Sequence, residues 1–387
     1  MNAAMAEKIR MIDDYIQKLD NAIKAKDSNL AKQIQHEVIA VYENEKELFH
    51  SSLDHTSEEL AKCHSQKDQF FMRKEIVLNE LKKQNFALEK LSAVVGRGGQ
   101  LSPLKAGGYY VNEAMKRRII QGPIIAHASN LGALLAAAVA DPLHIPAFIY
   151  DAVGSDEMLP VAKITGIAGL KRESFCHVLN TKAMARKAAS EKGKTYQDMN
   201  FVIAHLGGGI SVSAHKQGRI IDVITDDGGP FSPERSGSVP ILYIVDMCYS
   251  GQYSKAELKK KLRGMGGLKA LLGTFDCREI EKRIADGDEE AKLAYDAEAY
   301  QIAKGIGEMA TTMDGKIDEI ILTGGIANSK MLTGMIEEHV KFIAPVHVMP
   351  GENELESLSL GALRILRGEE TAHTYEDPAP AKEDLYV

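Results

Sequence analysis

A run of three glycines between two apolar strands is the feature that most constrains how this chain folds. Residues 201–206 and 210–214 are rich in β-branched and other apolar side chains, so Gly207-Gly208-Gly209 is predicted to form a tight hairpin turn. Such a turn has two explanations. It can simply need positive φ, or its bare backbone can present N–H groups in an arc that holds phosphate. Short glycine runs are weak motifs alone, so the rest of the chain must decide.

Length and composition indicate a globular protein of more than one domain. The chain has 387 residues, which exceeds what one hydrophobic core usually serves. A net charge of −7 gives no general attraction for nucleic acid or an anionic membrane. The four cysteines are far apart, so neither a zinc site nor a disulfide framework is indicated. The sequence lacks a signal peptide and any run long enough to span a membrane, so we expect a cytoplasmic protein.

Residues 1–37 have a different pattern from the rest of the chain. Isoleucine and leucine recur there at helical spacing between charged residues, and Asp27-Ser28-Asn29 can cap a second helical stretch. We therefore expect a short helical hairpin over 1–37. Its apolar stripe is too short for a coiled coil and is more typical of packing on a neighbouring surface.

From Val38 onward the pattern is that of an α/β protein. Alternating helical and strand-like segments place polar residues at the ends of strands, which is typical of a site in a cleft at a sheet edge. The tail after Arg367 is rich in Glu, Ala and Pro and is expected to be poorly ordered. Strands are predicted at residues 38–42, 47–49, 93–99, 146–150 and 319–325, those at 93–99 and 146–150 being buried.

Two arginines stand in glycine-rich segments. Arg97 lies between Gly96 and Gly98 at the end of a predicted buried strand, and Arg235 lies in a loop, 228–237, that glycine and proline make rigid. A solvated surface arginine is the ordinary alternative. A guanidinium among small residues also suits a bidentate contact with a carboxylate or phosphate. For Arg97 the two explanations are balanced, whereas the rigidity around Arg235 favours a functional role.

Three further polar residues carry weaker signals. His177 can equally be a hydrogen-bonded core histidine. Asp151 follows a predicted strand and can be a helix cap, and Glu354 can be a surface acid. Taken singly, each structural explanation is stronger than the functional one.

Together, five segments resemble the butyrate kinase branch of the acetate and butyrate kinase family, within the fold group of actin, the Hsp70 ATPase and the sugar kinases. The resemblance covers roughly residues 38–370. The matching segments occur in order at residues 95–99, 127–133, 204–211, 229–237 and 322–325.

The resemblance implies an α/β fold of two actin-like ATPase (ribonuclease H-like) domains with a cleft between them. Residues 38–150 plus 354–387 would form the first kinase domain, and 151–353 the second. The implied reaction converts ATP and a short-chain carboxylic acid, with Mg²⁺, reversibly into an acyl phosphate and ADP. A homo-oligomer is expected on the same ground, with no nucleic-acid or membrane partner.

The resemblance also implies roles for single residues. Arg97 would bind the substrate carboxylate, and Arg235 would stabilise the transferring phosphoryl group, to which His177 would donate a hydrogen bond. Asp151 and Glu354 would orient magnesium or its waters, as hard oxygen ligands do. The phosphates and adenosine would be held by the glycine hairpin, its strands and the Thr-Gly-Gly turn, that is by His205, Gly207, Gly208, Gly209, Ser211, Thr323, Gly324 and Gly325.

The chain departs from the family at its N-terminal end. Members begin with a short strand that enters a phosphate loop of the type Asn-Pro-Gly-Ser-Thr-Ser, and this sequence occurs nowhere in the chain. The helical hairpin of 1–37 would replace that strand, leaving unpaired ladder groups on its neighbours. The loop ahead of Arg235, residues 222–229, also looks shorter than in many butyrate kinases.

This departure from the family has three possible interpretations. Loss of a single preorganised donor typically costs about 10²–10³-fold in rate, so a kinase of weak or absent turnover is our first expectation. The alternative is a catalytically inactive relative that binds nucleotide or a partner. A third possibility is a rearranged or wrongly assembled N-terminus joined to a kinase body.

Overall fold

The computed structural model describes residues 36–54, 66–99, 101, 104–121 and 128–376. These fall into two compact units. The first is formed by the chain up to Ser155 and again from Glu354 onward, and the second is the continuous stretch Asp156–Asn353. The predicted helical hairpin lies outside the described residues, except that its last two positions, 36 and 37, begin a strand.

The second unit is built on a five-stranded sheet in the order β10-β9-β6-β7-β8. The sheet contains an antiparallel meander, β6-β7-β8, and β9 and β10 continue it in parallel from β6. The strands are β6 (Asn200–Leu206), β7 (Ile210–Lys216), β8 (Arg219–Ile224), β9 (Glu319–Gly324) and β10 (Val346–Pro350).

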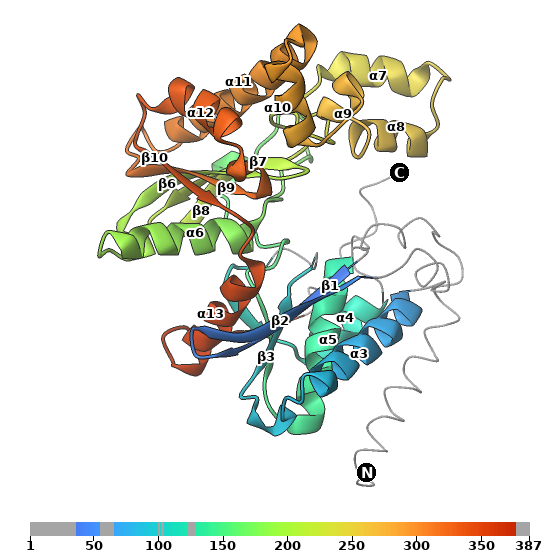
Figure 1. Cartoon of the computed structure of the whole chain (residues 1–387), viewed down its shortest axis with the longest axis vertical. Helices are drawn as coiled ribbons and strands as arrows, with labels where there is room; N and C mark the ends of the chain where they lie inside the picture. Colours follow the sequence, from blue (N-terminus) through green and yellow to red (C-terminus); the bar gives the residue numbers. More distant parts are fainter. Residues whose placement is uncertain (1–35, 55–65, 100, 102–103, 122–127, 377–387) are drawn as a thin grey trace. The chain divides into compact units, whose positions relative to one another are not determined.

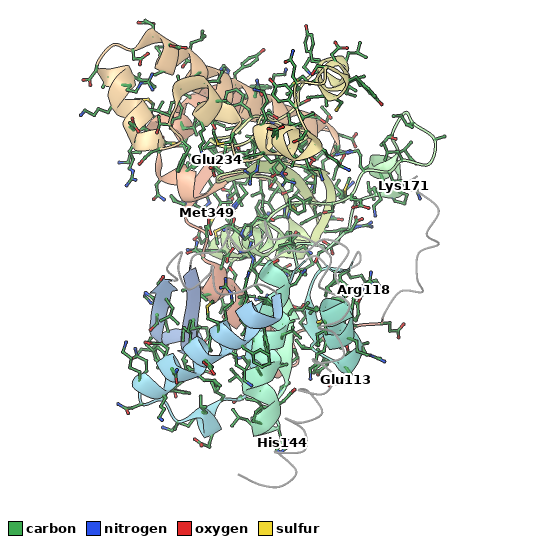
Figure 2. All side chains as sticks on the ribbon, turned by 90° about the vertical axis from the view of Figure 1, so that its right-hand side faces the viewer. Glu113, Arg118, His144, Lys171, Glu234 and Met349 are labelled. Atoms are coloured by element: carbon green, nitrogen blue, oxygen red, sulfur yellow. The ribbon has the colours of Figure 1, made fainter. Side chains whose placement is uncertain are left out.

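The central strand β6 is buried on both faces, which explains its continuous apolar sequence. Val202 and Ala204 pack in the cluster formed with α11 (Glu289–Thr311) and α12 (Lys330–Val340). Phe201 and Ile203 point the other way, into the cluster formed with α6 (Val178–Glu191) and with Met349 of β10, which is labelled in Figure 2. Figure 1 shows α6 on one side of this sheet and α11 and α12 on the other.

Four shorter helices complete the second unit. Ser254 caps α8 with a reciprocal Ser–Glu capping box, and Asp276 caps α10. In contrast, no residue of α7 is buried, although the helix is mostly apolar. The four helices are α7 (Ile241–Tyr249), α8 (Lys255–Leu262), α9 (Gly267–Leu272) and α10 (Cys277–Ala285).

The first unit contains a four-stranded sheet in the order β11-β4-β5-β3. Its strands are β3 (Val94–Arg97), β4 (Gly108–Tyr110), β5 (Ala147–Tyr150) and β11 (His373–Thr374). The helices of this unit are α3 (Gln66–Lys83), α4 (Glu113–Gln121), α5 (Leu131–Ala140) and α13 (Glu354–Leu366). The small residues Ala133, Ala136 and Ala137 let α5 approach the sheet closely.

A separate two-stranded sheet joins β1 (His36–Glu43) to β2 (Lys46–Asp54). The predicted strands at 38–42 and 47–49 are thereby confirmed. The turn between them is tight because Asn44 adopts a left-handed φ of 56°. Ile39 and Val41 pack in one apolar cluster with residues of α3, with Val139 of α5 and with Val94 of β3.

Two expectations about the first unit were wrong. The strand at 93–99 was expected to be buried, but all four residues of β3 are only half-buried, whereas those of β5 are all buried. The tail after Arg367 was expected to be poorly ordered; its residues 377–387 lie outside the described residues, and the expectation was wrong for residues 368–376. Instead, β11 pairs in parallel with β4, and Tyr375 is buried with its carbonyl accepting from Asn112 Nδ2 at 2.8 Å. One aromatic anchor outweighs the polar composition around it.

Candidate functional site

The glycine run forms the predicted hairpin, but its glycines do not need a left-handed backbone. Leu206 pairs with Ile210 across the turn. None of Gly207, Gly208 and Gly209 has positive φ. A Cβ added to Gly207 would meet only ordinary contacts at 3.4 Å, whereas one on Gly209 would lie 3.0 Å from Asp226 Oδ2. Because φ demands no glycine here and packing restricts only Gly209, close approach of a ligand to the bare backbone is the better explanation for Gly207 and Gly208.

The loop that carries Arg235 is fixed to this hairpin. Ser232, fully buried, donates from Oγ to the carbonyl oxygen of Gly208 at 2.6 Å. The loop also closes on itself, because the Ser232 N–H donates to the carbonyl of Arg235 at 3.1 Å. At Gly237, φ is +62° and a Cβ would lie 2.4 Å from the backbone nitrogen of Phe231. Glu234, labelled in Figure 2, has its Oε2 3.4 Å from the Cβ position of Gly208. The rigidity expected from the glycines and prolines is confirmed.

One carboxylate holds two arginines beside the hairpin. Asp226 Oδ2 lies 3.3 Å from Arg235 Nε and 2.7 Å from Arg263 Nη2. Residues 235 and 263 also form a backbone bridge, which places the two side chains on the same carboxylate. The cluster has two guanidinium groups for one carboxylate and therefore an excess of positive charge. It suits a phosphate group at the hairpin.

Sequence reasoning missed both Asp226 and Arg263. Arg263 directly follows the lysine-rich helix α8. In the sequence it resembles the solvated basic residues beside it, so no local pattern indicates a functional role for it. Asp226 lies in the loop ahead of Arg235, where its acidic neighbour Asp227 looks the same in sequence. Only tertiary pairing distinguishes these residues.

A second polar group lies at the carboxyl ends of β6 and β9, around Asn180 of α6. Asn180 is fully buried and donates from Nδ2 to the carbonyls of Gly351 and Glu352, at 3.2 and 2.7 Å. Its Oδ1 therefore accepts from His205 Nδ1 at 3.0 Å, which fixes the proton of a neutral His205 on Nδ1. Asn180 was also missed from the sequence.

His177 stacks against His205 and caps α6. The ring centroids are 4.4 Å apart. His177 Nδ1 accepts from the backbone N–H of Asn180 at 3.3 Å, so a neutral His177 carries its proton on Nε2. The helix-cap contact does not exclude a functional role, because the opposite nitrogen is then a donor.

The Thr-Gly-Gly turn follows β9 beside this group. Thr323 lies opposite His205 in the parallel register, and Ser211 lies opposite His205 on the antiparallel side. Gly324 has φ +92°, and a Cβ there would lie 2.4 Å from the carbonyl oxygen of Leu206. Glycine is required at Gly324 by backbone and packing alone, whereas a Cβ on Gly325 would meet nothing within 4 Å.

In the first unit, Arg97 and Glu354 form an ion pair. Arg97 Nη1 lies 3.1 Å from Oε1 and 3.3 Å from Oε2 of Glu354, at the start of α13. The glycines around Arg97 have a packing role. A Cβ on Gly96 would lie 2.1 Å from the carbonyl oxygen of Gly132, and one on Gly99 would lie 1.9 Å from Oδ1 of Asn130. They let β3 approach the start of α5 and are no evidence for a ligand.

Asp151 lies at the adjacent strand end in the same unit. Its predecessor Tyr150 is in register with Arg97 across the parallel pair β3–β5. Asp151 is buried, has a left-handed φ of 41°, and accepts from the N–H of Gly107 at 2.8 Å through Oδ1. A non-glycine residue held in this region stores strain, and such strain clusters at functional sites. It is not the cap of a helix.

The predicted residues thus form two groups. Arg97, Asp151 and Glu354 gather at the carboxyl ends of β3 and β5 in the first unit. In the second unit, the remaining residues gather around the ends of β6 and β9 and the glycine hairpin: His177, His205, Gly207, Gly208, Gly209, Ser211, Arg235, Thr323, Gly324 and Gly325.

One buried acid lies outside both groups. Glu298 of α11 is fully buried, and neither carboxylate oxygen has a hydrogen-bond partner among the residues that the structure describes. Burial raises the pKa of Glu298 to about 8. The pKa of Cys277 rises to about 12, mainly by burial and then by the proximity of Glu298. Glu298 is therefore mostly a neutral acid at neutral pH.

Comparison with known proteins agrees with this arrangement. Residues 164–358 match the Acetokinase family. The chain is 47% identical over 342 residues to a protein named probable butyrate kinase from Clostridium botulinum (strain Alaska E43 / Type E3), covering 87% of this chain and 96% of that protein. A probable butyrate kinase from Clostridium botulinum (strain Eklund 17B / Type B) matches to the same extent.

Solved structures of acetate and propionate kinases share the fold. The acetate kinase of Porphyromonas gingivalis superposes with a TM-score of 0.66 at 19% identity, covering 80% of this chain and 86% of that one. The propionate kinase of Francisella tularensis gives a TM-score of 0.61 at 19% identity, covering 81% and 86%. The fold is that of the actin-like ATPases, as expected from the sequence.

These findings define a phosphotransferase whose phosphoryl acceptor is a carboxyl group. More particularly, the chain belongs to the acetokinase family. Within the part of the chain that the structure describes, no helix combines the length and apolar character needed to cross a membrane.

Proposed function

We propose that this chain phosphorylates butyrate or a related short-chain carboxylic acid, with weak turnover in the sequence as it stands. An oxygen of the acid attacks the γ-phosphorus of ATP. The bond from that phosphorus to the bridging oxygen breaks, and ADP leaves with the electron pair, giving an acyl phosphate. The observation that carries the proposal is the Arg235–Asp226–Arg263 cluster beside a glycine hairpin in which neither φ nor packing requires glycine at Gly207 and Gly208.

The second unit binds the nucleotide in this proposal. Gly207, Gly208 and Gly209 present backbone N–H groups to the β- and γ-phosphates, and Gly325 leaves room for the adenosine. Arg235 neutralises the charge that develops on the transferring phosphoryl group, and His177 donates to it from Nε2. His205, Ser211, Thr323 and Gly324 keep the ends of the three strands β6, β7 and β9 in register beneath the phosphates.

The first unit binds the acid. Arg97 offers its guanidinium to the substrate carboxylate. In the structure described here, that guanidinium is paired with Glu354, so the incoming carboxylate competes with Glu354 for Arg97. Binding of the acid therefore frees the Glu354 carboxylate as it occupies Arg97, which couples substrate binding to a change of charge at the start of α13.

Mg²⁺ would accompany ATP. Asp151 and Glu354 supply the hard carboxylate oxygens that suit this ion. Glu354 fits the role only once Arg97 has turned to the substrate, because both of its oxygens lie against Arg97 Nη1. Mg²⁺ would neutralise phosphate charge and hold the phosphate oxygens in place.

Weak turnover is proposed because the sequence lacks the family's N-terminal phosphate loop. A relative that has lost catalysis and only binds nucleotide is the second candidate, supported by the same absence together with the retained arginine cluster. We also propose self-association. Ile241, Leu242 and Tyr249 of α7 are between 76% and 88% exposed, and a second copy of the chain would cover them.

One assay separates the two candidates. Purified protein, ATP, Mg²⁺, butyrate and hydroxylamine trap any acyl phosphate as a hydroxamate, while calorimetry with ADP measures nucleotide binding. We expect binding of ADP with turnover about 10²-fold or more below the 1–100 per second of typical kinases. Turnover within that ordinary range would refute the impairment. ADP binding with no turnover at all would favour the binding-only relative, and absence of ADP binding would refute both.

A further inference from the structure

Two strands of the first unit have an edge that no described residue pairs. The hairpin β1–β2 forms its own sheet, and β3 lies at the end of the four-stranded sheet with β5 as its only partner there. Beyond these partners, neither β1 nor β3 pairs with another strand in the described ranges. Unpaired strand edges are costly and invite another strand.

The two open strands occupy the same layer of the unit. Ile39 and Val41 of β1 share an apolar cluster with Val94 of β3 and Val139 of α5. Helix α13 contacts both β1 and β3. Strands that pack on the same helices without pairing to each other leave room between them for a further strand. A strand placed in this space, called the slot below, would lie about 4.8 Å from each strand with which it pairs.

The backbone of β3 shows which groups face this slot. Val94 donates its N–H toward the β5 side, to the carbonyl of Pro146 at 3.0 Å. The carbonyl of Gly98 accepts from Val153 on that same side at 3.3 Å. Because backbone groups alternate sides along a strand, those of Val95 and Arg97 point away from β5, into the slot.

In the second unit, a strand occupies the position that corresponds to this slot. There the antiparallel pair β7–β8 joins the parallel pair β9–β10 through β6, which is antiparallel to β7 and parallel to β9. The first unit has the corresponding antiparallel pair, β1–β2, and the corresponding parallel pair, β3–β5. The counterpart of β6 is not among its described strands.

We propose that the slot between β1 and β3 accepts one extended strand supplied in trans by a second polypeptide, antiparallel to β1 and parallel to β3. Like β6, its occupant is apolar on both faces and ends in a glycine-containing turn. In the second unit β6 directly precedes β7, so the segment of this chain in the corresponding position is the one directly ahead of β1. Residues 24–35 of this chain, Lys-Ala-Lys-Asp-Ser-Asn-Leu-Ala-Lys-Gln-Ile-Gln, contain no apolar run to fill it.

The slot opens beside the proposed substrate arginine. Arg97 is the last residue of β3, and its own backbone groups face the slot. A strand parallel to β3 would also end there and would present the turn that follows it next to Arg97. This consequence for activity rests on the proposed function, whereas strand binding itself does not.

The probe is a synthetic peptide that copies the segment of the Clostridium botulinum Alaska E43 relative ahead of the residues that align with β1. That relative is 47% identical to the chain over 342 residues. Amide exchange is followed in the full chain with and without peptide. We expect exchange at Val95 and Arg97 to slow about tenfold or more, while that at Gly96, which faces β5, stays unchanged. Hydroxamate formation is expected to rise about 10²-fold.

Two controls test whether backbone pairing is responsible. The same peptide with alternate backbone nitrogens methylated keeps its side chains but loses its donors, and it is expected to give no protection. In the chain, Val95→Pro removes an N–H that faces the slot while sparing the bonds to β5, whereas Val95→Ala removes as much side chain and keeps the N–H. Only Val95→Pro is expected to abolish the effect.

The outcomes test strand binding in the slot and the proposed kinase function independently of each other. No protection at Val95 and Arg97 with saturating peptide overturns the proposal, as does equal protection by the methylated peptide. Protection without any gain of hydroxamate supports the slot and counts against the proposed kinase function. A gain of hydroxamate without protection supports the kinase and overturns the slot.

Discussion

Asp226 and Arg235 form an ion pair, Oδ2 to Nε at 3.3 Å, directly beside the glycine hairpin. The same oxygen holds Arg263 at 2.7 Å, while Asp226 Oδ1 is buried and has no hydrogen-bond partner among the described residues. A carboxylate in this position keeps Arg235 ordered and also lowers the positive charge offered to phosphate. The pair therefore balances orientation of the arginine against its affinity for phosphate.

Asp226→Asn is expected to shift this balance. Removing the charge leaves two guanidinium groups without their counter-ion, so ADP should bind more tightly, and the free energy of unfolding should fall by about 1–3 kcal/mol because both arginines are partly exposed. Calorimetry with ADP and chemical denaturation give the two values. Asp296→Asn, which removes an exposed partner of Lys292, is the matched control. Unchanged or weaker ADP binding would contradict the proposed role.

Gly207→Ala tests whether the hairpin serves a ligand or the fold. Because Gly207 has no positive φ and an added Cβ meets only ordinary contacts, the free energy of unfolding should change by less than about 1 kcal/mol. A methyl group facing the phosphates should nevertheless weaken ADP binding about tenfold or more. Gly324→Ala, strained by a φ of +92°, is the contrasting control and should destabilise the protein strongly. A large loss of stability in Gly207→Ala with normal ADP affinity would refute the ligand explanation.

Asn180→Asp should be strongly destabilising. The carboxylate would replace the amide nitrogen of a fully buried side chain, which donates to two backbone carbonyls, so we expect a loss of about 2–4 kcal/mol in the free energy of unfolding. Asn328→Asp is the matched control, because its amide also donates to a carbonyl, that of Gly325, but at an exposed site. Equal losses in the two variants would show that the buried network around His205 does not exist as described.

Glu298 should make stability depend on pH. Its pKa is raised from 4.5 to about 8, so between these values the unfolded chain releases a proton that the folded chain keeps. Stability should therefore fall as pH rises from about 4.5 to 8, by at most about 1.4 kcal/mol per pH unit, and this contribution should level off above 8. Glu298→Gln should remove that slope in denaturation series across pH, whereas exposed Glu308→Gln should not. The same slope in both variants would exclude Glu298 as its cause.

Much of the fold could be predicted because strong local patterns and tertiary structure agree. The apolar run of β6 and the glycine hairpin follow directly from sequence, as do the two strands β1 and β2. The burial of β3 could not be predicted, because it depends on which segments distant in the sequence pack against the strand. The order of the tail was missed because Tyr375, a single anchor, decides it.

The candidate site was predictable only where chemistry and unusual backbone coincide. Arg235 stood out through its rigid loop, whereas Asp151, a polar residue after an apolar strand, carried only a weak signal of its own and was assigned through the family resemblance. Asn180 could not be found, because a buried amide within a helix looks like any other polar residue until its two carbonyl partners are known. Around Arg97 the glycines were misleading, since packing against the start of α5 explains Gly96 and Gly99, and packing against Ala152 explains Gly98.

The way α13 closes the first unit has a consequence for synthesis on the ribosome. Gly361 allows α13 to lie against the ring of Tyr150, with a Cβ position 2.6 Å from it, and Arg364 donates to the Tyr150 hydroxyl at 2.7 Å. Since Asp156–Asn353 is continuous, it emerges complete while the first unit still lacks this helix. The nascent first unit therefore cannot complete its folding, and the apolar face of β5 stays uncovered, until translation is nearly finished. Truncation after residue 353 should therefore leave a soluble second unit attached to a chaperone-dependent, protease-sensitive N-terminal part.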